Sequence, residues 1–370
     1  MKVLHVVGAR PNFMKVAPVV AALAGCGEVE QCLVHTGQHY DANMSDIFFT
    51  QLGIPKPDIN LEVGSGSHAV QTAQIMIKFE EVVLAEKPDW VLVYGDINST
   101  VAATLVAAKL HLPIAHVEAG LRSGDRTMPE EINRLVTDQI ADLLLTPSVD
   151  GDDNLLREGI APERIYCVGN VMIDTLVRLL PVAEELGMME RLTLQPQNYG
   201  LITLHRPSNV DEPAMLQKVM TTLLTISRDL PLVFPIHPRT RRRLEQLALP
   251  IDKANIQFTE PLGYLEFLGL QRHAKVIITD SGGIQEESTY LGVPCLTVRE
   301  NTERPVTVTI GTNLLVGQDM ARLHLETQRI LKGQGKQGAI PPLWDGKASE
   351  RIAQILLAQE KRKSTESNLL

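Results

Sequence analysis

Groups that can transfer protons follow several apolar runs of this sequence, at the position where each run ends. Asp96 comes shortly after the run WVLVY, Glu118 directly after PIAHV, and His205 directly after GLITL. A carboxylate or an imidazole held beside a substrate carbon can remove or return a proton. If the runs are parallel strands, their carboxyl ends share the edge where open α/β sheets bind ligands. The pattern therefore predicts an acid–base site built on strand ends.

A second group of residues suits a phosphate. The triplet SGG at 281–283 ends an apolar run and precedes a helical segment that carries Glu286 and Glu287. Such small residues let backbone N–H groups and a helix N-terminus approach a phosphate, and one glutamate could accept hydrogen bonds from ribose hydroxyls. Arg299 and Arg304 could bind a diphosphate bidentately. The combination predicts a nucleoside diphosphate site, with a tight turn before a surface helix as the alternative. Because no G-x-G-x-x-G fingerprint and no P-loop lysine motif occur, NAD and ATP are poor candidates.

Some of these side chains also have a purely structural alternative. Arg10 and Lys15, after the first apolar run, could be solvated loop cations. Asp96 could help to cap the following helix, although Asn98 or Ser99 fits the cap position better. We therefore favour a functional role for Arg10, Lys15 and Asp96.

Three further features stay open. Glu130 and Glu131 lie in the first turn of a helix begun by Pro129, where acids stabilise the helix dipole without any catalytic role. His237, at a strand end, could bind a ligand or hydrogen-bond a neighbouring loop. The run RTRRR at 239–243 is typical of a solvated helix face.

The elements that must position these groups alternate regularly. Continuous apolar runs are typical of parallel strands buried on both faces, and the helical patterns between them predict doubly wound parallel sheets. One such helix covers 67–86, where Val70, Ala73, Ile77 and Leu84 share one face. The predicted strands are 2–7, 31–35, 90–94, 113–117 and 143–146 in a first series, then 164–168, 200–204, 232–236, 255–258, 275–279 and 294–298 in a second series.

We therefore predict an α/β protein with two Rossmann-like domains whose strand ends converge on a central cleft. A chain of 370 residues exceeds the usual size of a single core. The predicted N-terminal domain, which carries the acids, spans 1–172, and the predicted nucleotide-binding domain spans 173–345. Residues 346–370 should form a helix at 347–361, packing back on the N-terminal domain, and a frayed tail.

Composition and charge exclude several classes of partner. The net charge is −9 and the basic residues form no block apart from the short RTRRR run, whereas nucleic-acid binding needs a basic face. No apolar stretch reaches the roughly 18 residues of a membrane-spanning helix. The four cysteines form no CxxC pair, so neither a zinc site nor a disulfide framework is predicted. These features are typical of a soluble, cytoplasmic protein.

Eight motifs follow one another along the chain. They are GARPNFMKVAP, TGQHYDANMSDIFF, YGDINSTVAA, HVEAGLRSGDRTMPEEINR, GNVMIDT, LHRPSNVD, DSGGIQEES and TERPVTV. In this order they resemble the motifs of the non-hydrolysing UDP-N-acetylglucosamine 2-epimerases. The resemblance covers nearly the whole chain and implies the glycosyltransferase-B architecture of two Rossmann-like domains. It also implies a homodimer, which is typical of that family.

The resemblance implies reversible conversion of UDP-N-acetylglucosamine to UDP-N-acetylmannosamine, for surface polysaccharide precursors. Members of the family are thought to eliminate UDP, which leaves 2-acetamidoglucal, and to add UDP back after C2 is protonated on the other face. Removing the C2 proton requires a positioned base, and departure of the diphosphate requires cations and N–H donors. This chemistry needs no redox partner, so no metal and no cofactor are expected.

The resemblance also implies residue roles, carried over position by position. The catalytic residues would be Asp96, Glu118, Glu130 and His205. His205 is expected to assist the leaving diphosphate rather than to act as the C2 base, and the motifs do not tell which carboxylate removes the proton. The predicted substrate-binding residues are Arg10, Lys15, Phe267 near the uracil, Ser281, Gly282, Gly283, Glu287 and Arg304, together with His237.

The motifs depart from many bacterial members of the family at several places. LHRPSNVD stands where those members have GHRRE, and TGQHYD replaces a stretch associated with a second, allosteric UDP-sugar. We therefore expect no allosteric activation by substrate. Three alternatives for the function stay open: a 2-epimerase of a UDP-2,3-diacetamido sugar, a UDP-sugar glycosyltransferase, and a binding protein that has lost catalysis.

Overall fold

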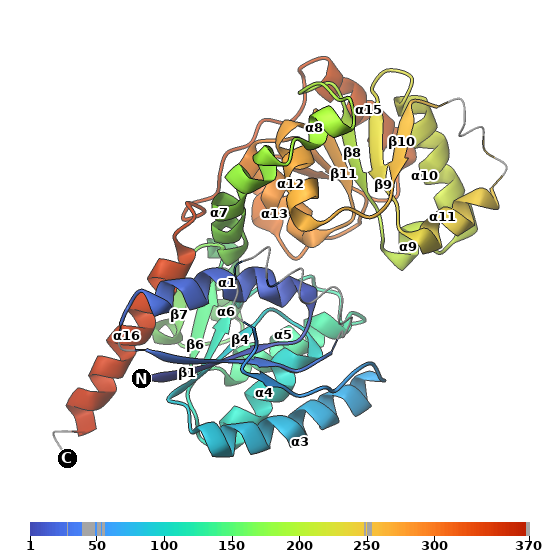
Figure 1. Cartoon of the computed structure of the whole chain (residues 1–370). Coiled ribbons are helices and arrows are strands. Elements are labelled where there is room, and N and C mark those ends of the chain that lie inside the picture. The colour runs from blue at the N-terminus through green and yellow to red at the C-terminus, as the bar shows by residue number, and fades with distance from the viewer. Residues whose placement is uncertain are drawn as a thin grey trace. The chain divides into compact units, whose positions relative to one another are not determined.

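The chain folds into two compact units, each built around one parallel sheet (Figure 1). The computed structural model describes residues 1–27, 29–38, 49, 53, 56–247, 249 and 254–367, without the side chains of Arg10 and 363–367. The N-terminal unit comprises Met1–Thr175 and Pro342–Leu370, and the C-terminal unit comprises Leu176–Pro341. Both sheets are α/β layers with helices on their faces, which confirms the predicted fold class.

The described strands of the N-terminal unit form a parallel sheet in the order β3-β2-β1-β4-β5-β6-β7. Their side chains are buried on both faces, as with Val91 and Leu92 of β4, because helices cover both sides. This burial explains why the sequence runs are continuously apolar. The strands are β1 Lys2–Val7, β2 Glu30–His35, β3 Ile59–Asn60, β4 Trp90–Tyr94, β5 Ile114–Val117, β6 Leu143–Thr146 and β7 Ile165–Cys167.

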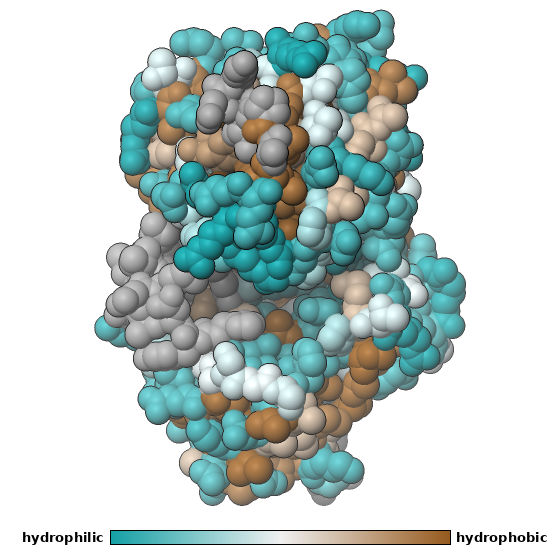
Figure 2. Space-filling model, turned by 90° about the vertical axis from the view of Figure 1, so that its right-hand side faces the viewer, coloured by the Kyte–Doolittle hydropathy of each residue, from teal (hydrophilic) through white to brown (hydrophobic). Residues whose placement is uncertain are grey.

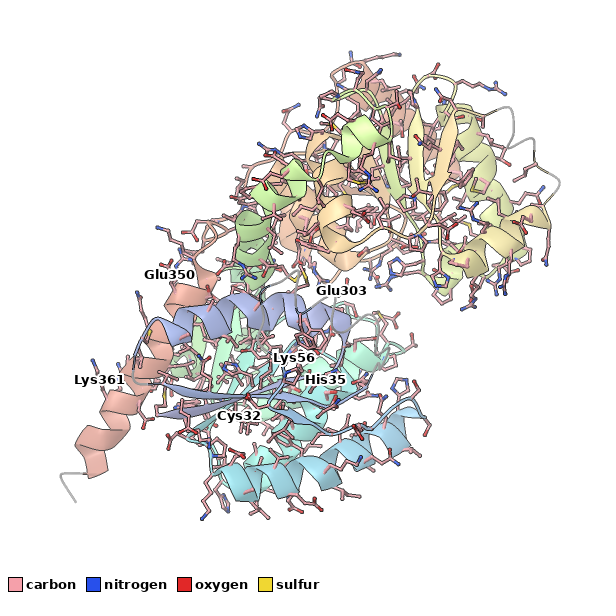
Figure 3. All side chains as sticks on the ribbon, viewed as in Figure 1. Cys32, His35, Lys56, Glu303, Glu350 and Lys361 are labelled. Carbon is pink, nitrogen blue, oxygen red and sulfur yellow. The ribbon has the colours of Figure 1, made fainter. Side chains whose placement is uncertain are left out.

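The helices of this unit lie on opposite faces of its sheet (Figure 1). The helix α1 (Arg10–Ala24) covers one face and contacts α16 (Ala348–Ser367), whose Glu350 and Lys361 are labelled in Figure 3. The other face is covered by α3, α4 and α5, which pack side by side. Their bounds, with those of the remaining helices, are α3 His68–Glu86, α4 Asn98–Lys109, α5 Pro129–Ile140, α6 Val149–Arg157 and η1 Pro162–Arg164. The helix α7 (Val171–Glu185) begins in this unit and continues into the C-terminal unit.

The C-terminal unit repeats this arrangement with the strand order β10-β9-β8-β11-β12-β13. Adjacent residues of β8 (Gly200–Thr203) belong to different hydrophobic cores. Ile202 packs toward α10 and α15, whereas Leu201 packs toward α8 and α12. The strands are β8 Gly200–Thr203, β9 Leu232–Pro235, β10 Ile256–Thr259, β11 Val276–Thr279, β12 Cys295–Thr297 and β13 Asn313–Leu315. The helices are α8 Met188–Arg191, α9 Pro207–Val210, α10 Pro213–Ile226, α11 Pro238–Glu245, α12 Tyr264–His273, α13 Gly282–Leu291, α14 Pro305–Thr309 and α15 Met320–Leu331.

Every predicted strand is present, each within one residue of its predicted ends. Two short edge strands, β3 and β13, escaped prediction because two or three residues give no readable periodicity. The strand at 164–168 was assigned to the second series, which is wrong. It is β7, which pairs with β6 in the first sheet, because an apolar run does not encode which sheet it joins.

Two helix predictions need correction. Val70, Ile77 and Leu84 on α3 are 51%, 64% and 57% exposed, and the residues packed on the sheet are on another face, with Ile75 and Phe79 among them. The helix has two apolar stripes, and the stripe with the large aromatic ring is the one that packs. At the C-terminus, α16 continues to residue 367, through most of the predicted frayed tail.

Candidate active site

Asp96 lies in the turn after β4, one residue beyond Gly95, whose φ is +64°. Its Oδ2 accepts a hydrogen bond from Arg134 Nη1 at 2.6 Å, and its backbone oxygen accepts one from Asn133 Nδ2 at 2.8 Å. The N-cap residue of α4 is Ile97, which makes no side-chain cap. Asp96 is therefore not a capping residue, and its carboxylate is held by a buried guanidinium group.

The helix-cap role expected for Asn98 or Ser99 is also wrong. Asn98 Nδ2 donates to Gln71 Oε1 at 2.8 Å, and the Ser99 hydroxyl group donates to Gln38 Oε1 at 2.8 Å. These two side chains connect α4 to its neighbours, so they are engaged in packing rather than in capping.

Glu118 and Lys15 form a buried ion pair at the strand end beside Asp96. Lys15 Nζ donates to Glu118 Oε2, and both side chains are at least nine-tenths buried. A Cβ atom on Gly95 would lie 2.8 Å from Lys15 Nζ, so a side chain there would displace the lysine. Glu118 has a φ of +75°, a conformation that costs an L-residue about 1–2 kcal/mol. Strain of this kind is typical of functional sites.

The structure separates the two acids at the start of α5. Glu131 is buried and accepts hydrogen bonds from the Ser123 and Gly124 N–H groups at 3.0 and 2.9 Å, and it pairs with Arg134. Burial opposes ionisation of Glu131, but these donors lower its pKa. Glu130 is only half-buried. Glu131 therefore shapes the loop before α5, and Glu130 is the more exposed acid of this pair.

In the C-terminal unit, His205 is fixed by a buried carboxylate. His205 Nδ1 lies 3.1 Å from Asp280 Oδ1, and Asp280 also accepts hydrogen bonds from the backbone N–H groups of His205 and Arg206 and from Asn209 Nδ2. Although Asp280 is fully buried, these partners lower its pKa. The His205 ring remains 58% exposed. The Asp280 carboxylate at Nδ1 orients the ring and leaves Nε2 available to a ligand.

The triplet at 281–283 forms the N-terminus of α13, with Ser281 at the N-cap position. A Cβ atom on Gly282 would lie 2.5 Å from Arg304 Nη1, so a glycine is required by the close approach of this guanidinium group. Arg304 in turn pairs with the buried Glu286, at 2.8 Å between Nε and Oε1. The turn thus combines a helix N-terminus with a fixed cation, an arrangement that suits an anion.

Glu303, which is labelled in Figure 3, lies within 4 Å of three guanidinium groups, those of Arg206, Arg299 and Arg304. Its Oε2 accepts a hydrogen bond from Arg299 Nη1 at 2.9 Å, and its two oxygens lie 3.7 and 3.6 Å from Arg304 Nη1 and Arg206 Nη2. Burial opposes ionisation, but the two adjacent guanidinium groups lower the pKa of Glu303 to about 2. Arg299 is buried, whereas the side chains of Arg206 and Arg304 are 31% and 12% exposed.

Glu287, one turn into α13, is buried, and no cation lies beside it among the residues that the structure describes. Its Oε2 accepts a hydrogen bond from Gln271 Nε2 at 2.6 Å, and the Tyr264 side chain is also within its reach. Burial raises the pKa of Glu287 to about 7. The folded protein therefore holds a carboxyl group that gains from any further hydrogen-bond donor, such as a ribose hydroxyl group.

The remaining predicted residues are placed as follows. The exposed His237 accepts the Arg239 N–H at its Nδ1 and caps α11, a structural role that differs from the expected hydrogen bond to a neighbouring loop. Phe267 on α12 is half-buried against the core of its unit. The Arg10 side chain lies outside the described residues, as does part of TGQHYD, on which the expectation about allosteric activation depends.

Sequence reasoning gave no role to three residues that hold the site together: Arg134, Gln271 and Asp280. Arg134 and Asp280 lie within recognised motifs, and that position was the available signal, whereas Gln271 lies outside the motifs. Their partners come from distant parts of the chain, so their roles required the fold.

Comparison with known proteins decides the family. The family model described as UDP-N-acetylglucosamine 2-epimerase matches residues 21–357. The chain belongs to this family. A UDP-N-acetylglucosamine 2-epimerase of Methanocaldococcus jannaschii is 44% identical over 96% of this chain and 99% of its own length. A UDP-2,3-diacetamido-2,3-dideoxy-D-glucuronate 2-epimerase of Pseudomonas aeruginosa is also 44% identical, over the same shares of the two chains.

A solved structure supports the same assignment. The M. jannaschii 2-epimerase in complex with UDP-GlcNAc and UDP matches 97% of this chain and 100% of its own, with a TM-score of 0.86 and 43% identity. The predicted family and enzyme class, a UDP-N-acetylglucosamine 2-epimerase, are thereby confirmed. Among the residues that the structure describes, no helix of this epimerase is long and apolar enough to cross a membrane.

Proposed function

We propose that the protein interconverts UDP-N-acetylglucosamine and UDP-N-acetylmannosamine by eliminating UDP and adding it back. The observation that carries the proposal is the pair of cation-held carboxylates, Asp96 and Glu118, at adjacent strand ends of the sheet. The N-terminal unit supplies the acids, and the C-terminal unit supplies the groups that bind UDP.

Two carboxylates suit a reaction that inverts a carbon, because a proton must leave one face of C2 and return to the other. Lys15 Nζ contacts Glu118 Oε2 and Arg134 Nη1 contacts Asp96 Oδ2, so each of the two carboxylates has a cationic partner. We assign the half-buried Glu130, in the first turn of α5, as a third acid–base group. We assign the proton transfers to these acids, with Asp96 and Glu118 serving opposite faces.

The C-terminal unit binds the leaving diphosphate and assists its departure. The N-terminus of α13, with Arg304 and Arg206 beside it, binds the diphosphate. His205, held by Asp280, donates a proton or hydrogen bond to the departing oxygen. Glu287 accepts hydrogen bonds from the ribose hydroxyl groups, and Phe267 lies near the uracil.

The electrons balance without an external oxidant. A carboxylate takes the C2 proton, the C2–H electron pair forms the C1–C2 double bond, and the C1–O bond breaks so that UDP leaves with its electron pair. In the second half of the reaction, an acid protonates C2 on the opposite face, and UDP adds again at C1. Turnover therefore exchanges the C2 hydrogen with solvent while no UDP is consumed.

Proton NMR of UDP-GlcNAc incubated with the enzyme in D2O tests the proposal. We expect UDP-ManNAc with deuterium at C2 and little net release of UDP. Free ManNAc together with UDP would indicate a hydrolysing reaction instead. Release of UDP that depends on an added acceptor would indicate a glycosyltransferase, and the absence of any exchange would refute the assigned substrate.

A second substrate has specific support. The P. aeruginosa relative named for UDP-2,3-diacetamido-2,3-dideoxy-D-glucuronate is as similar to this chain as the M. jannaschii enzyme is. Both substrates share UDP and a 2-acetamido group, so the residues named above serve either one. Comparing kcat/KM for the two nucleotide sugars decides between them, and we expect the higher value for UDP-GlcNAc.

We also propose a homodimer formed through α3 and α5. Hydrophobic residues reach the surface of the N-terminal unit in Figure 2, and Val70, Ile77, Leu84 and Ile132 are large apolar side chains exposed on these two helices. A shallow groove between α3, α4 and α5 lies beside them, lined by Met76 and other residues. Sedimentation should show a dimer that Ile77→Lys dissociates. A wild-type monomer would contradict this.

The enzyme is proposed to act in the cytoplasm. UDP-sugars are made from cytoplasmic nucleotides, and the four cysteines are all free thiols, as expected in a reducing compartment. Cell fractionation with antibody detection is the direct test, and recovery outside the cytoplasmic fraction would contradict the proposal.

A further inference from the structure

His116 is a fully buried polar residue that the proposed reaction does not use. It lies in β5, two residues before Glu118, and none of its surface is exposed. Its ring sits between Gly95 and Asp138. The Nε2 atom is 2.8 Å from the Gly95 carbonyl oxygen, and the Nδ1 atom is 2.6 Å from Asp138 Oδ1.

The two partners determine where the protons of this ring lie. A carbonyl oxygen can only accept a hydrogen bond, so Nε2 must carry a hydrogen. Asp138 Oδ2 already accepts hydrogen bonds from the Gly120 N–H at 3.1 Å and from Arg122 Nη1 at 2.7 Å. These two donors favour the carboxylate form of Asp138, and Nδ1 must then donate to Oδ1. His116 is therefore protonated on both nitrogens and carries a positive charge.

A row of alternating charges compensates for burying this cation. Arg122 donates to both carboxylate oxygens of Glu158, at 2.8 and 2.7 Å. The row His116, Asp138, Arg122 and Glu158 thus alternates in sign and sums to zero. Burial opposes ionisation of Asp138, but His116 and Arg122 hold the pKa of its carboxyl group below the usual range. Desolvated charges are tolerated when each has a partner with good geometry, as here.

His5, on β1 of the same sheet, provides a natural contrast. It is equally buried, but its ring contacts the Tyr94 hydroxyl group at 2.7 Å and Gln31 Oε1 at 3.0 Å, and both partners are neutral. Burial lowers the pKa of His5 to about 4. Burial in this sheet therefore favours a neutral imidazole unless a carboxylate is supplied, and Asp138 supplies it at His116.

The His116–Asp138 pair also joins two turns. The turn after β4 contains Gly95, with a φ of +64°, and the turn after β5 contains Glu118 and Gly120, with φ values of +75° and +81°. Glycine adopts a positive φ without strain, so the strained residue is Glu118, whose conformation persists only where surrounding contacts enforce it. The His116 ring holds the Gly95 carbonyl group and the Asp138 carboxylate holds the Gly120 N–H, so this pair provides contacts to both turns at once.

We propose that His116, protonated on both ring nitrogens, and Asp138 are positioning residues that set the separation of the Asp96 and Glu118 carboxylates. This role rests on the proposed function of those two carboxylates. The pair touches no substrate and acts through the backbone of the two turns. Its removal should therefore slow proton transfer while leaving recognition of the UDP part unchanged.

The protonation state is tested directly on the substrate-free, full-length enzyme labelled with ¹⁵N in its histidine rings. At pH 8, long-range ¹H–¹⁵N correlation should show an imidazolium ring that Asp138→Asn converts to a neutral one. The amide of that variant can donate to Nδ1 and still accept from Gly120 and Arg122, so the hydrogen bonds survive without the charge. The inference is overturned if the wild-type spectrum shows no doubly protonated histidine ring. It is also overturned if every such ring is still doubly protonated in Asp138→Asn.

The positioning role is tested by kinetics on UDP-GlcNAc. His116→Gln and Asp138→Ala should each lower kcat by about 10- to 100-fold with KM within about twofold of wild type, as expected for misplaced catalytic groups. Asp138→Asn should retain most of kcat, which a general loss of folding would not predict. Wild-type kcat in His116→Gln would overturn the role. If the His116 ring is neutral and the enzyme is active, this inference is refuted and the proposed function stands. If the ring is an imidazolium but the protein turns over no UDP-sugar, the proposed function is refuted, and the positioning role is refuted with it.

Discussion

Replacing Glu287 by Gln should make the C-terminal unit more stable at pH 8 while weakening its binding of UDP. The carboxyl group is 2% exposed, lies beside no cation in the described structure, and has a pKa raised by burial from 4.5 to about 7. Between pH 4.5 and 7 the unfolded chain releases this proton before the folded protein does, so the free energy of unfolding falls as pH rises. Above pH 7 the free energy of unfolding has fallen by its full amount, about 3 kcal/mol.

The assay must report on the C-terminal unit. Both tryptophans, Trp90 and Trp344, lie in the N-terminal unit, so their fluorescence is unsuitable. Urea unfolding followed by circular dichroism, with hydrogen exchange of β11 to assign the transition, measures the required free energy. Glu287→Gln should gain up to about 3 kcal/mol at pH 8 and little at pH 4.5. Calorimetric titration should show UDP affinity reduced about tenfold, since a hydrogen bond to a charged group contributes about 1.5–3 kcal/mol.

The neighbouring glutamate provides a matched control. Glu286 is equally buried on the same helix, but it pairs with Arg304. Glu286→Gln should therefore lose stability at pH 8, because breaking a buried pair leaves a charge without its partner. The reasoning would be refuted if Glu287→Gln lost stability at pH 8, or if its gain did not shrink toward pH 4.5.

Three further substitutions test the catalytic and binding assignments. Glu118→Gln should lower kcat by about 10²-fold with UDP binding retained, and wild-type turnover would remove Glu118 from the catalytic set. Asp280→Asn should lower kcat by about tenfold, because an amide cannot serve as the anionic partner of His205; an unchanged pH–rate profile would contradict this. Gly282→Ala should weaken UDP binding by about tenfold in calorimetry, since the new Cβ displaces Arg304, and an unchanged Kd would show that the close approach is unimportant.

Much of the fold was predictable because parallel strands buried on both faces leave continuous apolar runs in the sequence. The runs at β1, β4 and β6 matched the observed strands at both ends. The choice of buried face on α3 was not predictable, because the helix carries two apolar stripes and only packing against the sheet selects one. Membership of β7 in the first sheet likewise depends on the path of the connecting chain.

For the candidate site too, the sequence predicted some features, and others required the structure. Residue type and position at strand ends predicted Asp96, Glu118 and His205 as site residues, but nothing local distinguished Glu130 from Glu131. The structure makes that distinction because the loop before α5 turns its N–H groups toward Glu131 alone of the two.

The order of the amino acids was enough to predict the strand bodies, the small residues at 281–283 and the acids and bases at strand ends. These are local requirements of sheet burial and of backbone approach to an anion. The charge partners, in contrast, depend on the fold. Glu118 meets Lys15 and His116 meets Asp138 because parallel strands bring distant turns to one edge of a sheet. Ionisation in a buried site depends on such partners, so the chemistry of these carboxylates is a property of the fold.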